Sequence, residues 1–143
     1  MRYYLSLGSN LGNREQTLHE AVRRIGQQIG TVTRCSSFFY SEPWGFESTH
    51  PFCNLCCAVE TAMQPMEVLA ATQQIERELG RTRKSIIEHR KSIYSDRPID
   101  IDIIRAFDDA QKEIVSSSSL LTIPHPLYQQ RDFVVIPLQE IMP

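Results

Sequence analysis

The stretch "PIDIDIIRAF", residues 98–107, alternates isoleucine with aspartate in the pattern of a β-strand that has one buried face. Successive side chains on a strand point to opposite faces, so the alternating isoleucines are predicted to face a core. Asp100 and Asp102 then share the other face, about 7 Å apart along the strand. Two carboxylates at this spacing repel each other unless a cation lies between them. The stretch therefore predicts either a divalent-cation site or a solvated outer strand face.

The segment before this strand is strongly basic. Mg²⁺ in proteins commonly takes one or two carboxylates together with substrate phosphates, and guanidinium groups bind phosphate oxygens well. A charged loop can also be simply solvated, but beside paired carboxylates it favours a site for an Mg²⁺–nucleotide complex. The cationic side chains between Gly80 and the strand are Arg81, Arg83, Lys84, Arg90, Lys91 and Arg97, against only Glu88 and Asp96.

Length and composition predict one domain that occupies residues 1–143. The chain is 41% hydrophobic and 22% charged, as in soluble globular proteins. Its net charge of −2 gives no overall electrostatic footprint for nucleic acid. No apolar run approaches the roughly 20 residues of a membrane span, and "MRYYLSLGSN" has too short an apolar segment for a signal peptide. We expect a cytoplasmic protein with no membrane or nucleic-acid partner.

The four cysteines, at positions 35, 53, 56 and 57, include one C-x-x-C spacing. That spacing could indicate a zinc or redox pair, in which His50 would be a further metal ligand. The surrounding "PFCNLCCAVE" alternates like a strand, however, so Cys53 and Cys56 should face opposite sides. We expect reduced, packed thiols.

Apolar periodicity and turn residues predict the order β-α-β-β-α-β. The first helix should begin near Asn13, whose side chain can cap free N–H groups, and end at Gly30. The second should begin at Pro65 and end at Gly80. This order is that of an α+β, ferredoxin-like fold, an antiparallel sheet with helices packed on it. The strands are expected at 2–7, 31–40, 52–62 and 98–107, and one or two short helices are expected near the C-terminus.

Two further groups have side chains suited to ligands. Phe52 and Asn54 share a strand face, where an aromatic plane and an amide can stack on and read a flat heterocycle, with Phe133 as a second plane. Both phenylalanines could instead belong to the core. In "TIPHP", His125 could donate a hydrogen bond to phosphates, or it could be satisfied by the local backbone.

These motifs, in this order, resemble the 6-hydroxymethyl-7,8-dihydropterin pyrophosphokinase family of folate biosynthesis. The family transfers pyrophosphate from ATP to the hydroxymethyl group of the dihydropterin and releases AMP. The resemblance extends over nearly the whole chain and is carried by "LSLGSNLGNRE", "SSFFYSEPWG", "PFCNLCCAVET", "IERELGRTRK", "DRPIDIDII", "LTIPHP" and "RDFVVIPLQEI".

The resemblance implies a role for each matching residue. Asp100 and Asp102 would ligate two Mg²⁺ ions, and Arg81 and Arg97 would act with them in catalysis. ATP would be held by Glu76, Arg81, Arg97, His125 and Arg131, with adenine against the backbone near Ile103 and Thr122. The pterin would lie between the rings of Phe52 and Phe133 and would be hydrogen-bonded by Asn54. The remaining pterin contacts would come from the loop of Glu42, Pro43, Trp44 and Gly45, and from Tyr94, which stands where many members have a tryptophan.

Two alternatives stay open at this point. A non-enzymatic ferredoxin-like module, for example an RNA binder, would carry the aromatic K/R-G-F/Y-type signature, and this chain has none. A pyrophosphokinase homologue that binds ATP without turnover is a second alternative, because "YSDRP" (94–98) departs from the family pattern. The enzyme reading predicts a monomer whose substrates are ATP and the hydroxymethyl-dihydropterin. No general base is evident, although Asp102 could accept the proton.

Overall fold

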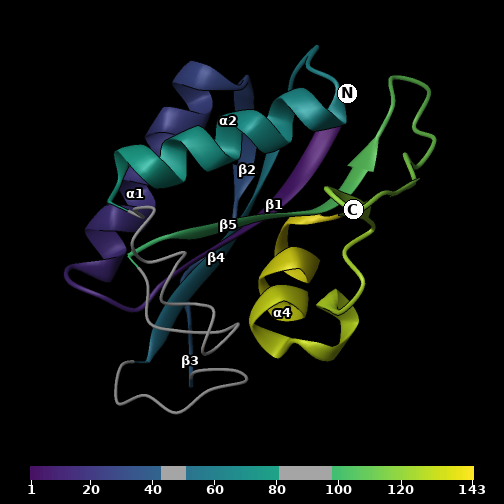
Figure 1. Ribbon diagram of the computed structural model, residues 1–143. Helices are drawn as coiled ribbons and strands as arrows, with labels where there is room; N and C mark the ends of the chain where they lie inside the picture. The colour runs from purple at the N-terminus through teal and green to yellow at the C-terminus, as the bar shows by residue number, and fades with distance from the viewer. Residues whose placement is uncertain (43–50, 81–97) are drawn as a thin grey trace.

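The computed structural model describes residues 1–42, 51–80 and 98–143, and its central feature is an antiparallel sheet (Figure 1). The strands lie in the order β2-β4-β1-β5, and β3 pairs with the same β4 that pairs with β2. Their bounds are β1 (Arg2–Ser9), β2 (Thr31–Cys35), β3 (Phe39–Ser41), β4 (Phe52–Glu60) and β5 (Asp100–Phe107).

Helices cover both faces of this sheet. Figure 1 shows α1 (Arg14–Gln28) and α2 (Pro65–Glu78) side by side over one face, and α4 (Asp132–Ile141) on the other. A 3₁₀ turn, η1 (Tyr128–Gln130), precedes α4, and a small hairpin of β6 (Ser116–Ser117) and β7 (Thr122–Ile123) follows β5. The predicted α+β, ferredoxin-like class and the predicted short C-terminal helices are therefore confirmed.

Strand alternation divides the apolar side chains between two cores. On β1, Tyr3, Leu5 and Leu7 are fully buried beneath α1 and α2. Tyr4 points the other way and packs with Ile104 in the core beneath α4. The sheet is thus buried on both faces along much of its length, so the face that carries Asp100 and Asp102 is not simply an outer, solvated one.

The predicted single strand at 31–40 is wrong, because it is two strands separated by an irregular segment. Ser36 donates its backbone N–H to Cys56 O at 2.8 Å, while its hydroxyl accepts the Cys56 N–H at 2.9 Å. A side chain thus replaces a backbone carbonyl in the ladder. Phe39 then pairs with Asn54, so three residues advance on one strand for two on β4. This extra residue divides β2 from β3.

The helix ends follow the predicted capping residues. The Asn13 side chain accepts the Gln16 N–H at 3.1 Å, and Gly80 ends α2 with φ +106°, a conformation that favours glycine. Gly30 has a different reason to be glycine: a Cβ there would lie 2.1 Å from Glu60 O. Close approach of the chain to β4, rather than a left-handed conformation, requires glycine at this position.

The cysteines are free thiols, and those on β4 are packed as predicted. The prediction is wrong for Cys35, which is exposed at the end of β2. Cys53 and Cys57 lie in the core beneath α1 and α2, whereas Cys56 lies in the core beneath α4. Burial raises the pKa of Cys56 to about 12. The C-x-x-C spacing therefore does not bring two thiols to one metal. His50, the other predicted ligand, lies outside the described residues.

The sequence shows no apolar run as long as a membrane span, and the helices of the structure can be compared with that length. Among the described ranges 1–42, 51–80 and 98–143, no helix is both long enough and apolar enough to cross a bilayer.

Candidate active site

The candidate site is built on a row of residues that crosses three strands. Gly8 on β1 is the register partner of Asn54 on β4 and of Asp100 on β5. One step along the strands, Ser6 is the partner of Asp102. The side chains of Asn54, Asp100 and Asp102 therefore share one sheet face, with no side chain at Gly8 between them. The sheet thus brings the paired carboxylates and the Asn54 amide to one surface, whereas the sequence predicted each group only on its own strand.

Asp102 lies in an unfavourable environment for a carboxylate in the absence of a cation. Burial, and then the negative charges of Asp100 and Glu76, raise its pKa well above the usual range. The Arg131 guanidinium partly opposes this increase in the Asp102 pKa. Two neighbouring carboxylates thus oppose the ionisation of Asp102 and one guanidinium favours it, which is the electrostatic condition that favours a divalent cation.

Glu76 reaches the same strand from α2. Its side chain is buried, and Oε2 accepts the backbone N–H of Ile101 at 2.8 Å. Ile101 stands between the two aspartates, so α2 holds the part of β5 that carries them. The resemblance predicts an ATP-site role for Glu76; its contact with the Ile101 backbone is an additional, structural one that the sequence did not indicate.

His125 has one nitrogen occupied by local backbone and one left for other partners. Its Nδ1 accepts the Leu127 N–H at 3.2 Å, so in the neutral ring the proton is on Nε2. Burial and the nearby Arg131 lower the pKa of His125, while Asp100 opposes them. The backbone of His125 also donates to Ile104 O on β5 at 2.8 Å. The imidazole is therefore held beside the aspartates as a neutral hydrogen-bond donor.

Arg131 and Phe133 come from the start of α4. The Arg131 guanidinium carbon lies 5.8 Å from the centre of the Phe133 ring, within the range of a cation–π contact. Arg131 is buried, and Phe133 is half-buried against the core beneath α4. One residue with a predicted ATP role and one with a predicted pterin role thus share the N-terminal end of the same helix.

Phe52 and Asn54 lie beside Gly8 on β4, the strand that flanks β1 on the side opposite β5 and its aspartates. A Cβ on Gly8 would be 3.0 Å from Asn54 Oδ1 and 3.4 Å from Phe52 Cδ1. The Asn54 Nδ2 donates to Phe39 O at 2.9 Å and to Ser41 Oγ at 2.8 Å, both on β3. Sequence reasoning found Phe52 and Asn54 by strand alternation but missed Gly8 and Ser41, because only strand register places them there.

The chain's own residues fit Mg²⁺ in the manner of an ion shared with phosphates. Within residues 1–42, 51–80 and 98–143, no cluster of three or more His, Cys, Asp or Glu side chains could hold a metal ion. Asp100 and Asp102 therefore supply too few ligands for a closed protein site. Mg²⁺ typically keeps waters and takes one or two carboxylates plus phosphates, so this donor set suits it.

The other residues predicted to bind ATP or the pterin differ in their exposure to solvent, and several lie outside the described ranges. Ile103 is buried in the core, so only its backbone could meet adenine, as the resemblance implies. Thr122 on β7 and Glu42 after β3 are exposed. The other predicted site residues lie outside the described part of the chain: Pro43, Trp44, Gly45, Arg81, Tyr94 and Arg97.

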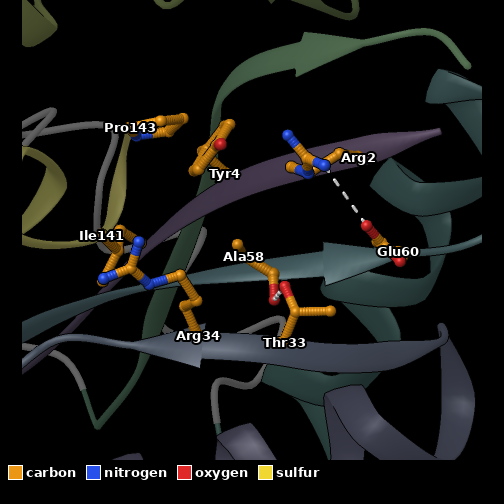
Figure 2. Close-up of a pocket in the computed structure, with 8 residues that line it drawn as sticks. All are labelled: Arg2, Tyr4, Thr33, Arg34, Ala58, Glu60, Ile141 and Pro143. Carbon is orange, nitrogen blue, oxygen red and sulfur yellow. Dashed lines mark hydrogen bonds and ion pairs between the residues drawn. The ribbon is translucent and has the colours of Figure 1, made fainter. Parts of the chain in front are cut away.

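A hollow of about 280 Å³ lies at the other end of the sheet, away from these residues (Figure 2). Arg2, Arg34 and Tyr4 line it, and Arg2 pairs with Glu60 at 3.4 Å across its wall. None of the predicted site residues lines this hollow. The candidate active site is therefore the surface around Asn54, Gly8 and Asp100, and not this hollow.

Comparison with known proteins decides the family. The model of the 7,8-dihydro-6-hydroxymethylpterin-pyrophosphokinase (HPPK) family matches residues 4–143. The chain belongs to the HPPK family. It is 45% identical over 140 residues to 2-amino-4-hydroxy-6-hydroxymethyldihydropteridine pyrophosphokinase of Porphyromonas gingivalis, covering 98% of this chain and 90% of that one. Its identity to the Bacillus subtilis HPPK is 40%, covering 96% of this chain and 76% of that one.

Solved HPPK structures show the same fold. An HPPK-DHPS crystallised in complex with substrates matches with a TM-score of 0.66 at 14% identity, covering 98% of this chain and 40% of that one. A Plasmodium falciparum HPPK-DHPS triple mutant matches with a TM-score of 0.63, covering 99% of this chain and 40% of that one. The protein is thus an ATP-dependent pyrophosphokinase of folate biosynthesis, and the predicted family, activity and enzyme class are confirmed.

Proposed function

We propose that this HPPK uses Asp100 and Asp102 to hold two Mg²⁺ ions, which it needs to transfer pyrophosphate from ATP to 6-hydroxymethyl-7,8-dihydropterin. When bound, Mg²⁺ neutralises charge on the triphosphate and makes the phosphorus more electrophilic. The observation that supports this assignment most directly is the pair of aspartates on one face, in surroundings where a carboxylate is costly without a cation.

The ATP phosphates are proposed to lie over the end of β5. His125 can donate its Nε2–H to a phosphate oxygen, because its Nδ1 is occupied by the Leu127 N–H. Arg131 supplies a buried positive charge beside Asp102. Arg81 and Arg97, which lie outside the described residues, are assigned to the phosphates by sequence resemblance alone. Adenine is proposed to contact the backbone near Ile103 and Thr122, with Glu76 also at the ATP site.

The pterin is proposed to lie on the other side of Gly8, stacked between Phe52 and Phe133. Asn54 would hydrogen-bond its ring, because the amide lies beside the Phe52 ring and next to the vacant Cβ position of Gly8. The loop of Glu42, Pro43, Trp44 and Gly45, and Tyr94, are assigned by resemblance to the same substrate. In this proposal the pterin lies over β4 and the phosphates lie over β5, the two strands that flank β1.

Catalysis in this arrangement is mainly positioning and charge stabilisation. The hydroxymethyl oxygen attacks the β-phosphorus of ATP, the bond from that phosphorus to the α-phosphate oxygen breaks, and AMP leaves. The hydroxyl proton has to leave during the attack, and Asp102 is the candidate acceptor among the described carboxylates. The cationic side chains stabilise the charge that develops on the transferred group.

The decisive experiment measures pterin-dependent AMP formation against Mg²⁺ concentration for the wild type and Asp102→Asn. We expect the variant to fold and to lose at least about a hundredfold in kcat, since an electrostatic contact in the transition state is removed. Asp109→Asn is the matched control, because the Asp109 side chain is 94% exposed and pairs with the N-terminal amino group at 2.9 Å, away from the candidate site. A folded Asp102→Asn enzyme with wild-type AMP formation would exclude the metal assignment.

The protein is further proposed to act as a monomer of one domain in the cytoplasm. Three buried free thiols suit a reducing compartment. Sedimentation of the purified chain at micromolar concentration tests the monomer, for which a single species of about 16.5 kDa is expected.

A further inference from the structure

We propose that Ser41 is a positioning residue that, together with the Phe39 carbonyl, holds Asn54 in the orientation in which it offers a hydrogen-bond acceptor to the pterin. The inference rests on the proposed function, in which Asn54 recognises the heterocycle. Ser41 is the last residue of the short strand β3, directly opposite Phe52 on β4. Neither the motif spacing nor the family resemblance pointed to it.

The donor side of the Asn54 amide is fully used inside the protein. A side-chain amide nitrogen has two hydrogens. In Asn54, Nδ2 donates to Phe39 O at 2.9 Å and to Ser41 Oγ at 2.8 Å. Phe39 O can only accept, so the amide cannot be turned over without losing this contact. Asn54 is 2% exposed, which makes the loss of such a contact costly.

The acceptor side of the same amide faces the site. Oδ1 lies 3.0 Å from the place where a Cβ on Gly8 would be, so it is turned away from β3 and toward β1. Gly8 is also the register partner of Asp100. In the described part of the chain, no group donates a hydrogen bond to Asn54 Oδ1. Asn54 therefore presents an acceptor, and not a donor, to whatever lies above Gly8.

This arrangement sets the chemistry that the ligand must have. A heterocycle bound beside Phe52 has to present an N–H to Asn54, and the pterin ring has such groups in its amino substituent and its ring nitrogens. The Phe39 carbonyl fixes which end of the amide is the donor. Without the Ser41 hydroxyl, the second Nδ2 hydrogen loses its acceptor, and the amide can pivot about the contact with Phe39 that remains. Ser41 thus helps Phe39 O to hold the acceptor of Asn54 in place, and acts on the substrate through Asn54.

Three substitutions at position 41 test this role. Ser41→Ala and Ser41→Val remove the hydroxyl, while Ser41→Thr keeps it; Val and Thr have similar shapes and both suit a strand. We expect Ala and Val to raise the KM for the pterin roughly fivefold or more, in line with one lost hydrogen bond. The KM for ATP should stay unchanged, and kcat should change less than the KM for the pterin does. Ser41→Thr should have the wild-type KM for the pterin. A merely structural role would lower the melting temperature without this split.

The controls separate this inference from the proposed function. Ser37→Ala removes another serine hydroxyl near β3, which donates to Glu140 Oε1 at 2.8 Å, and should leave the pterin KM unchanged. Asn54→Ala should weaken pterin binding more than any Ser41 variant. If Asn54→Ala weakens pterin binding but Ser41→Ala and Ser41→Val do not, the role of Ser41 is wrong and the proposed function stands. If Asn54→Ala has no effect, the pterin assignment itself is wrong, and the inference about Ser41 is wrong with it.

Discussion

The carboxylate of Glu76 on α2 is hydrogen-bonded to the backbone N–H of Ile101 at 2.8 Å, and Ile101 separates the two aspartates of the site. The contact ties a helix to the strand edge that carries the candidate metal ligands. The same carboxylate raises the pKa of Asp102 through its negative charge. Glu76 therefore holds the strand in place and, in the absence of a cation, opposes ionisation of the group it helps to place.

Substitution at Glu76 should separate these two effects. Glu76→Gln keeps an oxygen that can accept the Ile101 N–H but removes the charge, so we expect the melting temperature to be kept or raised. Glu76→Ala leaves the Ile101 N–H without its acceptor and should destabilise the fold by about 1–3 kcal/mol. Chemical denaturation of both variants measures the difference. Equal stability of the Glu76→Gln and Glu76→Ala variants would show that the hydrogen bond from the Ile101 N–H to Glu76 does not hold β5 in place.

Asp102→Asn should stabilise the metal-free protein at neutral pH. The raised pKa means that ionised Asp102 costs folding free energy above its unfolded-state pKa and costs nothing below it. Asp102→Asn should therefore raise the free energy of unfolding at pH 7, and this gain should shrink as the pH falls toward about 4, the usual pKa of an unfolded aspartate. Denaturation in EDTA at several pH values, with Asp109→Asn as the surface control, measures this trend. A gain that does not change with pH would contradict the electrostatic explanation.

Gly8→Ala should damage pterin binding more than ATP binding. The added Cβ would approach Asn54 Oδ1 to 3.0 Å and Phe52 Cδ1 to 3.4 Å, so both groups have to shift. We expect a rise of roughly tenfold or more in the pterin KM, since a buried amide is displaced. The KM for ATP should change much less. Steady-state kinetics with each substrate varied in turn tests this, and equal effects on both KM values would place Gly8 outside the pterin subsite.

Two glycines near the end of α1 should respond to alanine with opposite signs. At Gly30 a Cβ would lie 2.1 Å from the backbone oxygen of Glu60, so Gly30→Ala should cost about 2 kcal/mol or more. At Gly26, within α1, the nearest atom to an added Cβ is 4.0 Å away, so Gly26→Ala should stabilise by about 0.5–1 kcal/mol. Thermal unfolding measures both changes. A neutral Gly30→Ala would show that the chain can move away from β4.

Local chemistry allowed much of the fold to be predicted from sequence. Asn13, Pro65 and Gly80 mark helix ends because capping depends on residues a few positions apart. The alternation in β5 predicted the isoleucine and aspartate faces because the side-chain period of a strand is two. The division between β2 and β3 could not be predicted, since it depends on a hydrogen bond from distant Cys56 to Ser36.

The sequence by itself thus determined which residue types share a strand face, namely Asp100 with Asp102 and Phe52 with Asn54. Only the tertiary structure decided that these two pairs meet, because strand register aligns Asn54, Gly8 and Asp100 across three strands. It also decided the orientation of the Asn54 amide, which depends on Phe39 and Ser41 in a separate strand. Alternation is a property of one chain segment, whereas register and hydrogen bonding between strands depend on the packing of the whole sheet.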